Sequence, residues 1–160
     1  MSIGVGDSIP NVALQVWRDG GLHTIQSGPF FAGRRVLLVC MPGAFTPTCS
    51  REHLPGYIQM SDRLRAQGIA VACLTVNDPF VVHTWGEQLG AIGRVELLPD
   101  GNGELTRAMG LELDASPFGM GLRCKRAAIM VTEGRVSFLK IEADPNVVTS
   151  TAAAACMQAL

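Results

Sequence analysis

Residues 41–50 read Met41-Pro42-Gly43-Ala44-Phe45-Thr46-Pro47-Thr48-Cys49-Ser50. The residues just before, Val36–Met41, form an apolar run with the length of a buried strand, and Pro42-Gly43 ends that run. Thr46 suits the N-cap of a helix and Pro47 its first position, so we expect Cys49 in the first helical turn. Free backbone N–H groups and the positive end of the helix dipole favour a negatively charged sulfur there. The stretch therefore predicts a reactive thiolate.

The residue three positions before Cys49 separates this chain from thiol–disulfide enzymes of thioredoxin type. Those enzymes would have a second cysteine at position 46, making Cys-x-x-Cys, whereas this chain has Thr46. A hydroxyl one helical turn from the sulfur can hydrogen-bond either the thiolate or an oxygen that approaches it. This combination favours attack by a single cysteine on an oxygen-containing substrate. A structural cysteine on a buried helix is the alternative, and the capping signals make it the weaker one.

A longer segment carries a resemblance to a known family. Residues 42–57 read Pro-Gly-Ala-Phe-Thr-Pro-Thr-Cys-Ser-Arg-Glu-His-Leu-Pro-Gly-Tyr, which resembles the active-site signature of the peroxiredoxins, most of all their type II branch (the fifth subfamily). The likeness continues through Cys73–Phe80, Trp85-Gly86 and Lys125-Arg126, so it covers nearly the whole chain. It implies a thiol-dependent peroxidase that reduces hydrogen peroxide and organic hydroperoxides in antioxidant defence and cell redox homeostasis.

The family pattern, Pro-x-x-x-Thr-x-x-Cys plus a distant arginine, falls on Pro42, Thr46, Cys49 and Arg126. The resemblance implies that Cys49 attacks the terminal peroxide oxygen and becomes a sulfenic acid. It further implies that Thr46 holds the peroxide oxygens and that Pro42 shields the site from water. Arg126 is then expected to stabilise both the thiolate and the charge that develops on the leaving oxygen.

A reactive thiolate alone does not make a fast peroxidase. An ordinary thiol is about 3% ionised at neutral pH, so complete ionisation raises the reactive fraction only about thirtyfold. A thiol whose pKa is about 2.5 lower is also a weaker nucleophile by roughly tenfold, so the two effects nearly cancel. Fast reduction therefore requires donors aimed at the transition state. The candidates are the Thr46 hydroxyl, nearby backbone N–H groups and the Arg126 fork.

Arg126 stands directly before Ala127–Val131, an apolar run of strand type. Without the resemblance, an arginine at this place would be interpreted as a solvated charge at the edge of a sheet. Glu52 and His53 follow Cys49 by about one helical turn. Either could orient the catalytic arginine or threonine, and either could equally lie on a solvated helix face.

The pattern along residues 1–160 predicts one α/β domain with a thioredoxin-like fold, in which helices flank a central mixed sheet. After an extended N-terminal region, the expected strands are Val36–Met41, Ile69–Val76, Val95–Leu98, Ala127–Val131 and Val136–Ile141. The expected helices are Pro47–Gln67 with a kink at Pro55-Gly56, Pro79–Leu89 capped by Asp78, Glu104–Met109, and Val147–Leu160.

Composition limits the partners. The 160 residues carry a formal net charge of −1 and no basic run, which argues against nucleic acid and anionic membranes as partners. The N-terminus has no basic segment followed by an apolar one, and we expect a cytoplasmic protein. His23, His53 and His83 are scattered, so we expect no metal. Without a phosphate loop or a dinucleotide fingerprint, we expect no cofactor.

The remaining cysteines bear on how Cys49 is recycled. Cys40 and Cys73 lie inside apolar strands and are expected to be buried and inert, although some plant members of the branch have a resolving cysteine at the place of Cys73. Animal members carry theirs before the last helix, where this chain has Ser150. Cys124 and Cys156 are further candidate resolving cysteines that match no family motif. We therefore expect glutathione, glutaredoxin or thioredoxin to reduce the Cys49 sulfenic acid.

Two other functions stay open at this point. A peroxide sensor or redox-signalling protein would use the same Cys49 chemistry and pass oxidation to a partner. A non-catalytic binding module on a thioredoxin-like frame would need no reactive thiolate. Type II relatives commonly form dimers through the face around the active site, so we expect a homodimer, with Phe45, Phe80 and Phe118 as contributors.

Overall fold

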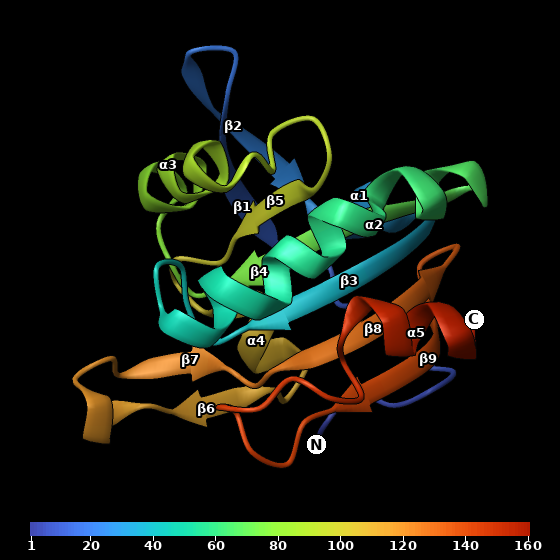
Figure 1. Cartoon of the computed structure of the whole chain (residues 1–160). Coiled ribbons are helices and arrows are strands. Elements are labelled where there is room, and N and C mark those ends of the chain that lie inside the picture. Colours follow the sequence, from blue (N-terminus) through green and yellow to red (C-terminus); the bar gives the residue numbers. More distant parts are fainter.

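The computed structural model describes residues 1–160 and has a five-stranded mixed sheet at its centre (Figure 1). Its strand order is β5-β4-β3-β8-β9, with β3 parallel to β4, β4 parallel to β5, and β8 antiparallel to both β3 and β9. The bounds are β3 Arg35–Met41, β4 Ile69–Thr75, β5 Glu96–Pro99, β8 Ala127–Thr132 and β9 Arg135–Ile141. All five expected strands are present.

The central strand β3 is buried on both faces, since every residue from Val36 to Met41 is buried. Because side chains alternate along a strand, Leu38 and Cys40 belong to one core cluster, and Val39 and Met41 to the other. A sheet covered on both faces explains why this strand is uniformly apolar and not alternating.

Different elements cover the two faces. One core cluster takes buried residues from α2 (Leu54–Ala66), α3 (Pro79–Leu89) and α5 (Ala153–Ala159), and Figure 1 shows α2 and α5 over the same face of the sheet. The other takes residues from α1 (Ser27–Phe31), α4 (Glu104–Ala108) and β1 (Ala13–Arg18). Asp78 caps α3 as predicted, because its carboxylate accepts from the N–H groups of Phe80 and Val81. None of the helices has the length and apolar composition needed to span a bilayer.

Two hairpins were not expected. The N-terminal region is not merely extended, since β1 pairs antiparallel with β2 (Gly21–Gln26) across a turn in which Asp19 and Gly20 both have positive φ. Asp-Gly is a strong hairpin signal, so this turn was visible in the sequence. The second hairpin joins β6 (Glu112–Asp114) to β7 (Leu122–Cys124), and three-residue strands are too short to show a period.

The irregularity expected at Pro55-Gly56 is present as a π-helical turn, but it lies before Pro55 and not at it. The helix begins at Pro47 as predicted, but Cys49–His53 is π-helical and α2 follows from Leu54. The N–H of Leu54 bonds to the carbonyl of Cys49, five residues back. Pro55 has no N–H to donate and its ring would clash with the preceding turn of an α-helix, so the wider turn relieves the conflict.

The last helix is shorter than expected, since α5 begins at Ala153 and not at Val147. The residues before it form a loop whose amides bond to the Glu142 side chain instead of to helical carbonyls.

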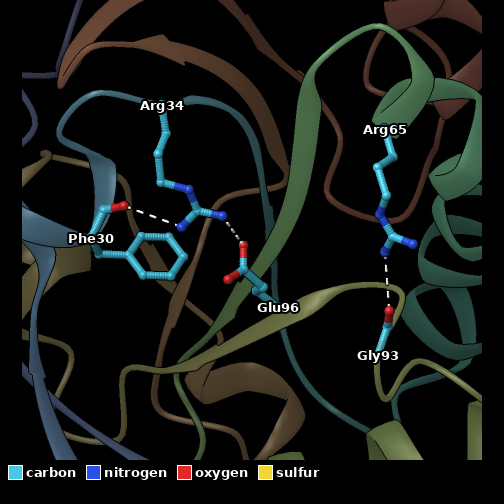
Figure 2. Close-up of polar contacts among 5 residues, drawn as sticks. All are labelled: Phe30, Arg34, Arg65, Gly93 and Glu96. Atoms are coloured by element: carbon cyan, nitrogen blue, oxygen red, sulfur yellow. Dashed lines mark hydrogen bonds and ion pairs between the residues drawn. The ribbon is translucent and has the colours of Figure 1, made fainter.

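Two arginines fasten the exposed edge of the sheet, as Figure 2 shows. Arg34, just before β3, donates to the carbonyl of Phe30 at 3.2 Å and pairs with Glu96 of β5 at 2.5 Å. Arg65 of α2 donates to the carbonyl of Gly93 at 3.0 Å. Arg34 thus contacts β5 itself and Arg65 the loop before it, and β5 is one of the two edge strands of the sheet.

Candidate active site

Strand β3 and the helix that follows set the position of Cys49. The connecting loop is held to the loop that follows β4, because the N–H of Ala44 donates to the Asn77 side chain at 2.9 Å. Phe45 then adopts φ +64°, which reverses the chain before the helix begins. The N–H of Ser50 donates to the carbonyl of Thr46 at 3.0 Å, so Cys49 lies in the first helical turn as predicted. Its side chain is fully buried.

Thr46 occupies the predicted position but makes a different hydrogen bond. Its hydroxyl donates to the carbonyl of Gly43 at 2.7 Å, and we find no side-chain cap at the helix start. The expected N-cap contact is therefore wrong in detail. Because the hydroxyl proton is directed at Gly43, the lone pairs of the Thr46 oxygen remain to accept a hydrogen bond from a protonated substrate oxygen.

Arg126 lies just before β8 and is 2% exposed, so the solvated edge position is excluded. One terminal nitrogen, Nη2, donates to the sulfur of Cys49 at 3.3 Å. The other, Nη1, lies 2.8 Å from Nδ1 of His53, and Nε donates to the carbonyl of Pro145 at 2.9 Å. The guanidinium thus has a separate partner at each nitrogen, which fixes its plane.

His53, and not Glu52, orients the arginine. Glu52 is exposed, whereas His53 is 1% exposed, so the solvated helix face applies only to the glutamate. Nε2 of His53 lies 3.0 Å from the carbonyl of Thr151, which can only accept, and Arg126 can only donate. The neutral ring therefore carries its proton on Nε2. Burial and the nearby Arg126 charge lower the pKa of His53 to about 4, although the Thr151 bond and the Glu142 charge oppose them.

All five cysteines are free and buried. Cys73 shares a core cluster with Cys49, and its pKa is raised by burial and by the nearby Cys49. Burial also raises the pKa of the Cys156 thiol, which accepts a hydrogen bond from Tyr57 at 3.2 Å. The thiol pKa of Cys40 is raised by a hydrogen bond with Cys124 and by burial. None of these four side chains presents a sulfur at the surface.

Helix α3 also contacts the segment that carries Cys49. The indole Nε1 of Trp85 donates to the hydroxyl of Ser50 at 3.0 Å. An open groove of about 990 Å³ lies elsewhere, around β5, and none of the four motif residues lines it. The fully buried Cys49 therefore lies outside this groove.

Comparisons with known proteins agree with this geometry. A family model described as Redoxin matches residues 4–155. The chain is 45% identical over 157 residues to peroxiredoxin-2E-2, chloroplastic, of Oryza sativa subsp. japonica, covering 94% of this chain and 70% of that protein. It is 36% identical to peroxiredoxin-2B of Arabidopsis thaliana, over 94% of both chains.

The chain belongs to the peroxiredoxin family.

A solved structure supports the same assignment. Reduced Prx3 from Vibrio vulnificus, in complex with H₂O₂, superimposes with a TM-score of 0.92 at 39% identity, covering 98% of both chains. The thioredoxin-like fold and the type II resemblance are thereby confirmed. This peroxiredoxin is a thiol-dependent peroxidase of antioxidant defence, an oxidoreductase that acts on peroxide and is reduced by thiols.

Proposed function

We propose that Cys49 is the peroxidatic cysteine and that Thr46, Arg126 and Pro42 complete its site. The contact of 3.3 Å between Nη2 of Arg126 and the Cys49 sulfur carries this proposal, because it places a permanent cation on the reacting atom. The Thr46 hydroxyl, fixed by Gly43, accepts from the peroxide, and Pro42, which is buried, shields the end of β3 from water.

The chemical step needs one proton from solvent besides these groups. The Cys49 thiolate attacks the terminal oxygen of the peroxide, so an S–O bond forms while the O–O bond breaks. The leaving oxygen develops negative charge beside Arg126 and takes up the proton from solvent to become water or an alcohol. Cys49 loses two electrons and becomes a sulfenic acid.

For recycling we propose a one-cysteine cycle with an external thiol, either glutathione with glutaredoxin or thioredoxin. One thiol condenses with the sulfenic acid to a mixed disulfide and releases water, and a second thiol attacks that disulfide to free Cys49. Burial raises the thiol pKa of Cys73 and of Cys156, which leaves little thiolate to attack an oxidised Cys49 and supports this cycle over an internal disulfide.

The test is to mix reduced protein with hydrogen peroxide in a stopped-flow instrument. Trp85 is a suitable fluorescent reporter, since its indole bonds to Ser50 beside the reacting cysteine. We expect fast oxidation of the wild type and none in Cys49→Ser. Oxidation no faster than that of a free thiol would contradict a peroxidase and favour the binding module.

Mass spectrometry of the product tests the recycling step. We expect a sulfenic acid, and Cys73→Ser should leave both the first oxidation and the turnover with added thiol unchanged. An internal disulfide, or turnover blocked by Cys73→Ser, would contradict the one-cysteine cycle. A long-lived disulfide with another protein would favour the sensor.

We further propose a homodimer through the face around the active site. Phe45, Phe80 and Phe118 are 49%, 54% and 72% exposed, and such aromatic side chains are enriched at interfaces. Phe118→Asp should shift the protein from dimer to monomer in sedimentation, with Leu160→Asp as the control. A monomeric wild type would contradict the proposal.

We also propose that the protein acts in the cytoplasm. Its five free thiols suit a reducing compartment, in which disulfides seldom form. Cell fractionation tests this, and recovery from an oxidising compartment would contradict it.

A further inference from the structure

Residues 142–151 connect β9 to the turn before α5, and we call them the strap. They form no helix or strand, but the Glu142 side chain at one end bonds to Thr149 and Thr151 at the other. The carboxylate of Glu142 accepts four hydrogen bonds. The N–H and hydroxyl of Thr149 donate at 2.7 and 2.8 Å, and the N–H and hydroxyl of Thr151 both donate at 2.9 Å. Burial alone would raise the pKa of Glu142, but these bonds outweigh it and lower the value to about 2. The Glu142 side chain is therefore an ionised carboxylate at neutral pH.

The closed strap presents backbone carbonyls to the active site. The carbonyl of Pro145 accepts from Nε of Arg126 at 2.9 Å, and the carbonyl of Thr151 accepts from His53 at 3.0 Å. The N–H of Glu142 itself donates to the carbonyl of Arg126 at 3.0 Å. Of the three partners of the guanidinium, one is the strap carbonyl of Pro145, and a second, His53, is itself held by the strap carbonyl of Thr151.

The strap matters because Arg126 can direct Nη2 at the Cys49 sulfur only when its other nitrogens are held in place by hydrogen bonds. If Nε and Nη1 of Arg126 keep their partners, Nη2 must face the Cys49 sulfur. If the strap opens, Nε of Arg126 loses the Pro145 carbonyl and His53 loses the Thr151 carbonyl, so the long arginine side chain can rotate away from the reacting atoms. A displacement of about 1 Å in a catalytic group can cost roughly a hundredfold in rate.

We propose that Glu142 is a positioning residue of the peroxidase, which latches the strap so that Pro145 and Thr151 hold Arg126 against Cys49. The proposal rests on the proposed catalytic roles of Cys49 and Arg126. It assigns no contact between Glu142 and the substrate.

The first test measures the second-order rate of oxidation by hydrogen peroxide in Glu142→Ala and Glu142→Gln. Three of the four bonds fall on Oε1 of Glu142, which the amide oxygen of glutamine replaces, so we expect Glu142→Gln within about threefold of wild type. Glu142→Ala loses all four bonds and should react about ten- to a hundredfold more slowly. Glu112→Ala, an exposed glutamate of β6, serves as the control and should react like wild type.

A double-mutant cycle separates positioning from general stability. If Glu142 acts through Arg126, then Glu142→Ala should add no further loss to Arg126→Gln. The same loss in both backgrounds, or a wild-type rate in Glu142→Ala, would overturn the proposal. Fast oxidation that survives in Cys49→Ser would instead refute the proposed function, so the two failures are distinguishable.

A second variant protects the test against misfolding. Should Glu142→Ala fail to fold, Thr149→Val with Thr151→Val removes two of the four bonds and keeps the carboxylate. We expect a smaller loss of rate, again absent in the Arg126→Gln background. An equal loss in that background would overturn the proposal.

Discussion

Lowering the pH should destabilise the folded protein through His53. The pKa of this histidine is about 4 in the folded chain and 6.5 when unperturbed, a difference of 2.5. Between pH 6.5 and 4 the unfolded chain binds a proton that the folded chain does not, so stability falls as the pH falls through this window. At about 1.4 kcal/mol for each pKa unit, the total loss is on the order of 3 kcal/mol.

Urea unfolding of the reduced protein at pH 7, 6, 5 and 4 measures this loss. In His53→Gln the amide can still accept from Arg126 and donate to Thr151, but it cannot take up a proton. The variant should therefore lose about 3 kcal/mol less than wild type over this range, whereas His23→Gln, in the exposed part of β2, should behave like wild type. Equal losses in the wild type and His53→Gln would refute the reasoning, because other titrating groups are common to both.

Three further predictions concern the site and the backbone. Thr46→Val should slow peroxide reduction about a hundredfold or more because it removes an oriented hydroxyl, while Thr46→Ser should remain within about tenfold of wild type in stopped-flow measurements. Arg126→Lys should slow the same reaction about ten- to a hundredfold, since an ammonium group cannot bond in three directions within one plane. Gly110→Ala should lower the melting temperature more than Gly119→Ala, because both have positive φ but only at Gly110 would the added carbon overlap another backbone segment.

The sequence predicted the central part of the fold well. Strands β3 and β4 are uniform apolar runs, and α3 carries its own cap and stop signals, Asp78 and Gly90, so local residues suffice to locate them. The π-helical turn was missed because the conflict created by Pro55 can be relieved in more than one way. The last helix was extended too far, since the sequence does not reveal that Glu142 captures the amides that precede it.

The site was only partly predictable. Cys49 and Thr46 follow from one short motif, but the contact between Arg126 and Cys49 joins residues 77 positions apart and came from family resemblance. The histidine of the first turn was a visible candidate, and the structure was needed to choose it over Glu52. Pro145 and Thr151 act through backbone carbonyls, which every residue possesses, so no side-chain pattern could reveal their part.

Complete burial of Cys49 gives the two halves of the catalytic cycle different rate laws. A peroxide is small enough to reach the sulfur through minor side-chain displacements, so oxidation should rise in proportion to peroxide concentration. A tripeptide or protein thiol is far larger and must wait until the turn that carries Cys49 opens. Reduction should therefore saturate at the opening rate as the reductant becomes abundant. The maximum turnover rate is then set by how fast the folded chain opens around Cys49, and not by the concentration of the reducing thiol.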